Sequence, residues 1–170
     1  MANRGEALEE LVIMANESYR TNKKAVIHKV PTEWKPIRGF VKGKYRIVSA
    51  KVEKQAAVDF LGHVKLKKRT LPLAFDVKEV SSGVRFPLLR VEPHQYNYLK
   101  DSAITGAFSF VLIAFWEIDK FYILPFDELD KRWIKWKKKT GPASVKAGES
   151  GLVEVKFTDY LNFLEGVSIV

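Results

Sequence analysis

Two aspartates and a lysine stand out in the stretch Gln55–Glu79, which otherwise consists of two apolar segments joined by a basic one. The pattern predicts two strands joined by a basic connection, with Asp59 inside the first strand and Asp76 and Lys78 near the end of the second. Successive side chains of a strand point to opposite faces, so Asp76 and Lys78 project from the same face. If the two strands pair antiparallel, Asp59 lies beside Asp76.

Two neighbouring carboxylates beside an ammonium group favour a divalent-metal site that hydrolyses phosphodiesters. Like charges this close are costly unless a cation neutralises them. Mg²⁺ prefers oxygen ligands and keeps several waters, so two carboxylates and a substrate phosphate suffice to hold it. Lys78 would orient or deprotonate the attacking water, or stabilise the transition state. The alternative is a salt bridge without catalytic role, because Asp-x-Lys is a common sequence.

The composition indicates one folded, basic domain over residues 1–170. The chain is 46% hydrophobic, and 29 Lys and Arg against 20 Asp and Glu give a net charge of +9. This excess favours a polyanionic partner, nucleic acid before an acidic membrane surface. Cysteine is absent, which excludes disulfides and thiolate catalysis. No signal-peptide pattern and no apolar run of about 20 residues is present, so we expect a cytoplasmic protein without a membrane partner.

A basic segment lies before the aspartates, at Arg38–Lys54. Glycines interrupt it, and we interpret it as a β-ribbon that projects from the body or as a mobile excursion between strands. A two-stranded ribbon fits a DNA groove, where its basic side chains would contact phosphates. The alternative is a solvated hairpin whose lysines protect an edge strand from aggregation. Its basic residues are Arg38, Lys42, Lys44, Arg46, Lys51 and Lys54.

The remaining elements predict an α/β fold, a mixed central sheet flanked by helices. Strands are expected at Lys24–Val30 (closed by Pro31 and Pro36), Arg85–Leu88, Phe108–Ile118 and Phe121–Pro125, and helices at Glu6–Thr21, Glu92–Ala103, Asp127–Lys138 and Asp159–Glu165. Asp127 and Thr158 are the expected caps of the last two helices. The Asp127–Lys138 helix carries lysines among aromatic residues, which indicates either a DNA-contacting or a solubilising face. Thr140–Gly151 is expected to be a linker or mobile loop.

Several short motifs along the first hundred or so residues resemble, in the same order, those of one nuclease family. They are Asn3-Arg4-Gly5 with Leu8-Glu9, Ala25–Lys29 with Pro31-Thr32, Val58-Asp59-Phe60 with Gly62, Phe75–Glu79, and Phe86-Pro87-Leu88 with His94-Gln95. The chain is similar in these motifs to the RecU-type Holliday junction resolvases, which are members of the restriction-endonuclease-like nuclease superfamily.

The resemblance implies a restriction-endonuclease-like fold with a projecting basic stalk, the segment 38–54. It also implies a homodimeric endonuclease that uses Mg²⁺ or Mn²⁺, one or two ions per active site. Such an enzyme makes paired symmetric cuts across a four-way DNA junction, working with a recombinase or a branch-migration helicase.

The resemblance also assigns roles to particular positions. Asp59, Asp76 and Gln95 would serve the metal, joined by the backbone carbonyl of Ala57, and Lys78 would be the catalytic lysine with Asp59 and Asp76. Glu9 would be an accessory residue. The expected DNA contacts are Arg4 and the stalk residues Arg38, Lys42, Lys44, Arg46 and Lys51.

The sequence departs from the family pattern close to the aspartates. Asp76 stands where the family carries Glu, and Ala56-Ala57 where it carries Ser or Thr, while the connection between the two aspartates is longer and more basic. These departures suggest a phage or prophage member. The alternative functions are a branched-DNA or nicking nuclease of the same fold, and a non-catalytic DNA-binding accessory protein of recombination.

Overall fold

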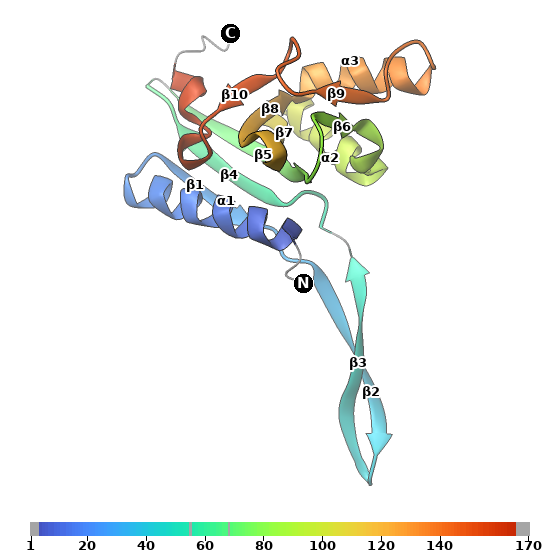
Figure 1. Cartoon of the computed structure of the whole chain (residues 1–170). Helices are drawn as coiled ribbons and strands as arrows, with labels where there is room; N and C mark the ends of the chain where they lie inside the picture. Colours follow the sequence, from blue (N-terminus) through green and yellow to red (C-terminus); the bar gives the residue numbers. More distant parts are fainter. Residues whose placement is uncertain (1–3, 55, 68, 166–170) are drawn as a thin grey trace.

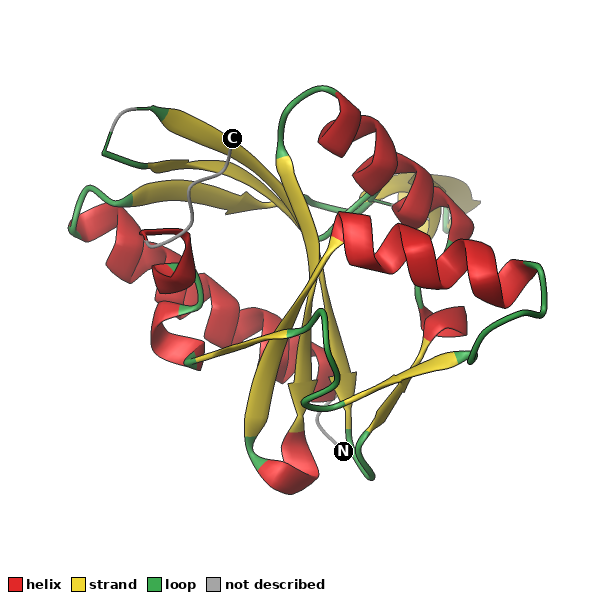
Figure 2. Cartoon of the chain, turned by 90° about the horizontal axis from the view of Figure 1, so that it is seen from above, coloured by secondary structure: helices red, strands yellow, loops and turns green. Residues whose placement is uncertain are grey.

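The body of the protein is a mixed sheet covered by helices on both faces (Figures 1 and 2). The computed structural model describes residues 4–54, 56–67 and 69–165, without the side chains of 4–6, 34 and 52–54. Within these residues the main sheet has the order β1-β4-β5-β7-β8-β10. Its strands are β1 (Ala25–Lys29), β4 (Phe60–Lys65), β5 (Thr70–Val80), β7 (Phe108–Phe115), β8 (Lys120–Pro125) and β10 (Val153–Val155). The expected α/β architecture is confirmed.

Strand β5 lies inside the sheet and connects its two halves. It pairs antiparallel with β4 and parallel with β7. Phe60, Phe75 and Phe110 stack across these three strands, with ring centroids 5.1 and 4.5 Å apart. Helix α1 (Arg4–Thr21) covers this face through Leu8 and Val12, both buried. The aromatic stack therefore fixes the register of β4 and β5 beside the two aspartates.

A second apolar core covers the opposite face of the sheet. Helices α2 (Pro93–Ile104) and α3 (Phe126–Lys137) pack there, with Tyr96 stacked on Trp133 at 4.6 Å. The short turn η1 (Leu88–Arg90) and a small sheet of β6 (Arg85–Pro87) and β9 (Ser144–Lys146) complete this layer. Both faces of β5 are covered along Leu73–Val77, so the polar Asp76 within this segment is buried. Over the described part of the chain, no helix is long and apolar enough to cross a membrane.

The C-terminal third differs from the sequence-based expectation in three places. The expected loop Thr140–Gly151 contains β9, which pairs antiparallel with β6 and buries Val145 fully. The expected last helix is instead a pair of short turns, η3 (Phe157–Asp159) and η4 (Asn162–Glu165), although Tyr160, Leu161 and Leu164 are buried as expected. Helix α3 already begins at Phe126, so Asp127 lies in its first turn and is not the cap.

Strand β7 is also shorter than expected. It ends at Phe115, and the turn η2 (Trp116–Ile118) leads into β8. Trp116 donates its indole N–H to the Glu79 carboxylate at 2.7 Å, which ties this turn to the end of β5. Beyond Phe115, this side-chain hydrogen bond connects the turn η2 to β5.

A two-stranded ribbon, which we call the stalk, projects from the body (Figure 1). It consists of β2 (Glu33–Val41) and β3 (Lys44–Lys54), so it begins before Arg38, where the sequence placed its start. Pro36 lies within β2 and does not end a strand, because each strand of a ribbon has a free edge that tolerates a missing N–H. Lys42 and Gly43 form its turn with φ of 50° and 75°, as a type I′ hairpin requires.

Gly62 lies on β4 where β1 approaches most closely. A Cβ atom built at this position would lie 2.2 Å from the Val26 carbonyl oxygen and 2.6 Å from Ile27 Cα, both backbone atoms that cannot rotate away. We expect Gly62→Ala to lower the free energy of unfolding by about 1–3 kcal/mol, as overpacking of a core does. Urea denaturation measures this change. Gly39→Ala is the matched control, because its Cβ would meet Val48 side-chain atoms only; an equal loss in both variants would contradict the backbone clash.

Candidate active site

Asp76 and Lys78 lie on the face of β5 that is turned toward α2. Their neighbours Phe75 and Val77 belong to the core beneath α1, so the alternation expected from the sequence is confirmed. Asp76 is 0% exposed, whereas the side chain of Lys78 keeps 16% of its surface. Asp76 Oδ2 lies 2.7 Å from Lys78 Nζ. The sheet thus holds a carboxylate in its interior with an ammonium group at the rim.

Asp59 lies beside Asp76, but not within a strand as expected. Strand β4 begins at Phe60, which is opposite Phe75, and Asp59 occupies the bend just before it. Its carboxylate accepts the backbone N–H of Val77 at 2.8 Å, while its carbonyl accepts the N–H of Val30 at 2.8 Å. The β4–β5 ladder ends here because the Asp59 side chain takes the N–H that a strand carbonyl would otherwise bind.

Gln95 joins the site from the first turn of α2. Its Nε2 donates to Asp76 Oδ1 at 2.8 Å, and its Oε1 accepts the backbone N–H of Glu92 at 3.0 Å. The Glu92 carboxylate in turn accepts the N–H of Gln95, which completes a capping box. The amide oxygen is therefore engaged with the helix end, and the amide nitrogen faces the carboxylate. The spacing of Glu92 and Gln95 was a signal for this cap that our sequence reasoning did not use.

The surroundings of Asp76 disfavour its charge when no cation is present. Burial and, to a smaller extent, the charge of Asp59 raise the pKa of Asp76, and the Lys78 ammonium lowers it without compensating, so that the pKa of Asp76 is about 8. A buried acid of this kind releases its proton when a cation takes the proton's place. We therefore expect metal binding to lower the pKa of Asp76.

One oxygen of the buried carboxyl group is held by the Lys78 ammonium group. Asp76 Oδ2 lies 2.7 Å from Lys78 Nζ, and it is not bound by Gln95, which donates to Oδ1. Among the described residues no three His, Cys, Asp or Glu side chains cluster around a common point, so a cation here would rely on Asp59 and Asp76. Two carboxylates suit Mg²⁺, which completes its shell with water and phosphate oxygens. The donor set therefore fits the expected metal.

The other residues singled out in the sequence are dispersed around this centre. Glu9 forms an ion pair with Lys29 on the α1 side of the sheet. Helix α1 begins at Arg4, whose side chain lies outside the described residues. Ala57 lines a pocket that adjoins Asp59. The expected stalk contacts Arg38, Lys42, Lys44, Arg46 and Lys51 are all exposed.

The outer face of α3 is basic, but only some of its cations are free of structural contacts. Arg132 donates to Glu128 and Glu149, each at 2.8 Å, and thereby fastens the loop after β9. Lys137 Nζ lies 5.0 and 4.3 Å from the ring centroids of Trp133 and Trp136. Arg132 and Lys137 on this face therefore stabilise the fold through these contacts.

Comparisons with known proteins agree with this architecture. The family model described as recombination protein U matches residues 3–169. A protein of Limosilactobacillus reuteri (strain DSM 20016), named Holliday junction resolvase RecU, is 36% identical over 138 residues, which cover 78% of this chain and 64% of that protein. Proteins of the same name from Oenococcus oeni and Pediococcus pentosaceus are each 30% identical, over 95% and 96% of this chain and 82% of each relative. The chain belongs to the RecU family. The resemblance seen in its motifs is confirmed, and the match spans less than two thirds of the L. reuteri protein's length.

The raised pKa of Asp76 predicts a pH-dependent stability of the metal-free RecU chain. Above its ordinary pKa the unfolded chain has lost this proton, while the folded chain keeps it until about pH 8. The folded state then binds more protons, so the free energy of unfolding falls as the pH rises. We expect a decrease of about 2–3 kcal/mol between pH 6 and pH 8, levelling off above, in urea denaturation with EDTA.

The Asp76→Asn variant isolates this contribution. It should lack the decrease, whereas Asp101→Asn, on the exposed side of α2, should retain it. Parallel stability profiles for the wild type and Asp76→Asn would contradict the assignment.

Proposed function

We propose that this RecU chain is a divalent-metal-dependent endonuclease that resolves four-way DNA junctions by paired symmetric cleavage. We further propose that it acts as a homodimer in the cytoplasm, together with a recombinase or branch-migration helicase. The observation that carries the proposal is the buried Asp76 carboxyl group, which has Asp59 beside it and Lys78 in ion-pair contact at its rim. The names of the relatives support the substrate.

Each residue of the site has a distinct task in this proposal. Asp59 and Asp76 would hold Mg²⁺ or Mn²⁺, and Gln95 orients the Asp76 carboxyl group through its Nε2. When bound, the metal would lower the pKa of a water and offset the charge that develops on the phosphate. Lys78 is close enough to Asp76 to reach the same phosphate, where it would position the attacking water or stabilise the transition state.

The stalk would provide selectivity for junction shape. Along the ribbon, Lys44 and Arg46 share one face with their cross-strand partners, while Phe40 and Tyr45 form an edge-to-face pair on the other. All four side chains are exposed. The basic face suits contacts with phosphates, and the aromatic face suits stacking against bases. Both contacts would form if the ribbon entered an opened junction.

Cleavage of labelled junctions tests the proposed reaction. We expect Mg²⁺-dependent paired cuts in a four-way junction and much slower cleavage of its linear arms. Asp76→Asn and Lys78→Ala should each lower the single-turnover rate at least 100-fold, about 3 kcal/mol of transition-state stabilisation, with junction affinity within a few-fold of the wild type. Asp101→Asn is the matched control and should retain full activity.

Three other outcomes would replace the proposal. Equal cleavage of junction and linear arms would indicate a general nicking nuclease. Tight junction binding without cleavage at any divalent metal would indicate an accessory DNA-binding protein. Unchanged rates in both variants would place the chemistry elsewhere on the chain.

The salt dependence of junction binding tests the stalk. We expect the Lys44→Ala/Arg46→Ala double variant to lose affinity and to reduce the slope of log K against log salt by about 2, because each lost phosphate contact releases about one fewer counterion. The Lys135→Ala/Lys138→Ala variant removes equal charge from α3 and should keep the slope of the wild type. The reverse result would move the DNA interface from the stalk to α3.

A further inference from the structure

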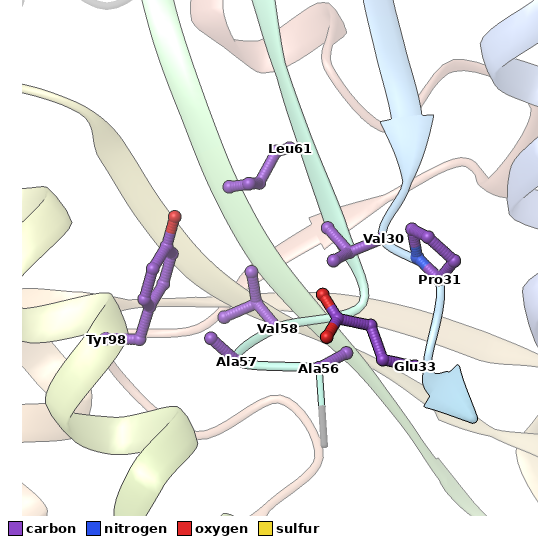
Figure 3. A pocket seen from close by; sticks show the side chains of 8 residues that line it. All are labelled: Val30, Pro31, Glu33, Ala56, Ala57, Val58, Leu61 and Tyr98. Atoms are coloured by element: carbon purple, nitrogen blue, oxygen red, sulfur yellow. The ribbon is translucent and has the colours of Figure 1, made fainter. Parts of the chain in front are cut away.

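A small pocket lies between the base of the stalk and α2 (Figure 3). Its volume is about 130 Å³, and its lining includes Val30, Glu33, Ala57, Val58, Leu61 and Tyr98. These residues come from the β1–β2 connection and the first residue of β2, from the segment that leads into β4, and from α2. Ala57 and Val58 belong to the motifs and the expected metal site, but Glu33, Leu61 and Tyr98 have no role in the site described above.

On both sides of the pocket, lining residues are close in sequence to residues of the candidate active site. Ala57 and Val58 directly precede Asp59, whose carboxylate is bonded to β5. Tyr98 lies one helical turn after Gln95, which donates to Asp76. A group seated in the pocket would therefore be a close neighbour of the phosphate that reacts.

The lining selects the part of a nucleotide that can enter. The walls are apolar, and Glu33 contributes a carboxylate whose oxygens lie on the Val58 side in Figure 3. A carboxylate repels phosphate, so the backbone of DNA is excluded. Tyr98 stands on the opposite side of the pocket from Glu33 and offers an aromatic face against which a base packs favourably.

Size and hydrogen bonding narrow the choice to one base. A cavity of roughly 150 Å³ holds benzene, so a pocket of 130 Å³ suits a single six-membered ring, that is, a pyrimidine. Cytosine presents an amino group that donates to a carboxylate, whereas thymine presents a carbonyl oxygen at the same position, which the carboxylate repels.

We propose that this pocket receives a cytosine next to the cleaved bond, and that Glu33 is the residue that selects cytosine over thymine. The inference rests on the proposed nuclease function and deepens it, because it assigns the sequence preference of the same site. Extruding a base costs a few kcal/mol and is easiest where pairing is already disturbed, as it is at a branch point.

Paired junction substrates test this assignment. They are identical except that one nucleotide flanking the cut is cytosine or thymine, and each flanking position is tested in turn. At one position we expect the wild type to cut the cytosine junction at least 10-fold faster. Glu33→Gln should reduce that ratio to about 3-fold or less, mainly by faster cleavage of the thymine junction, because an amide both donates and accepts. A general loss of rate on both junctions would indicate a merely structural role and would overturn the proposal.

A matched variant and a binding measurement complete the test. Glu17→Gln makes the same chemical change on the exposed side of α1 and should keep the wild-type ratio.

In Asp76→Asn, which should bind without cutting, the cytosine junction should bind several-fold tighter than the thymine junction, and adding Glu33→Gln should abolish that difference. Equal affinities in Asp76→Asn, or a ratio that Glu33→Gln leaves unchanged, would overturn the role of Glu33 whether or not the protein cleaves junctions. Loss of all metal-dependent cleavage with the binding preference intact would instead reject the proposed reaction and leave the pocket assignment standing.

Discussion

The central constraint in this protein is the burial of an acidic group inside a sheet. Asp76 lies on an interior strand with apolar cores on both faces, so its charge has no water to stabilise it. Within the described part of the chain, Lys78 is the cation that stabilises this charge, while the charge of Asp59 opposes it. Evolution rarely keeps such a group for stability, since an isostere without charge would cost less. The arrangement is understandable if a cation completes it.

The surrounding structure holds this acid in place from three directions. The Phe60–Phe75–Phe110 stack fixes the strands, the Asp59 carboxylate bonds the Val77 N–H, and Gln95 connects the acid to the capped end of α2. Further along β5, Arg90 donates to the Glu79 carbonyl oxygen and Trp116 to its carboxylate. Positioning by packed strands and a helix end is more exact than positioning by loops, which suits in-line attack on a phosphate.

The sequence predicted what depends on local pattern. Alternation along Phe75–Lys78 gave the faces of β5, and the helix expected at Glu92–Ala103 matches α2 to within one residue at each end. It could not predict features set by distant partners. Asp59 leaves the strand because of the Val77 N–H, and β9 forms within a polar, glycine-containing segment because β6 is available to pair with it. Likewise, the pocket with Glu33 and Tyr98 exists only after the β1–β2 connection and α2 have packed together.

Family membership and geometry address different questions in this chain. Membership in the RecU family comes from similarity over nearly all residues, and some of the relatives are named Holliday junction resolvases. The geometry shows how Asp76, on the interior of the sheet, keeps one carboxylate oxygen directed at Lys78 and the other at Gln95. In our proposals the stalk senses the shape of the junction, and the pocket at its base senses the identity of a base.

The most direct measurement is a titration of the Asp76 carboxyl carbon by NMR, with and without Mg²⁺. Without metal we expect the proton to be held until about pH 8, and with Mg²⁺ we expect the titration to move to distinctly lower pH. An Asp76 that titrates near its ordinary pKa and ignores Mg²⁺ would contradict the role given to this carboxylate.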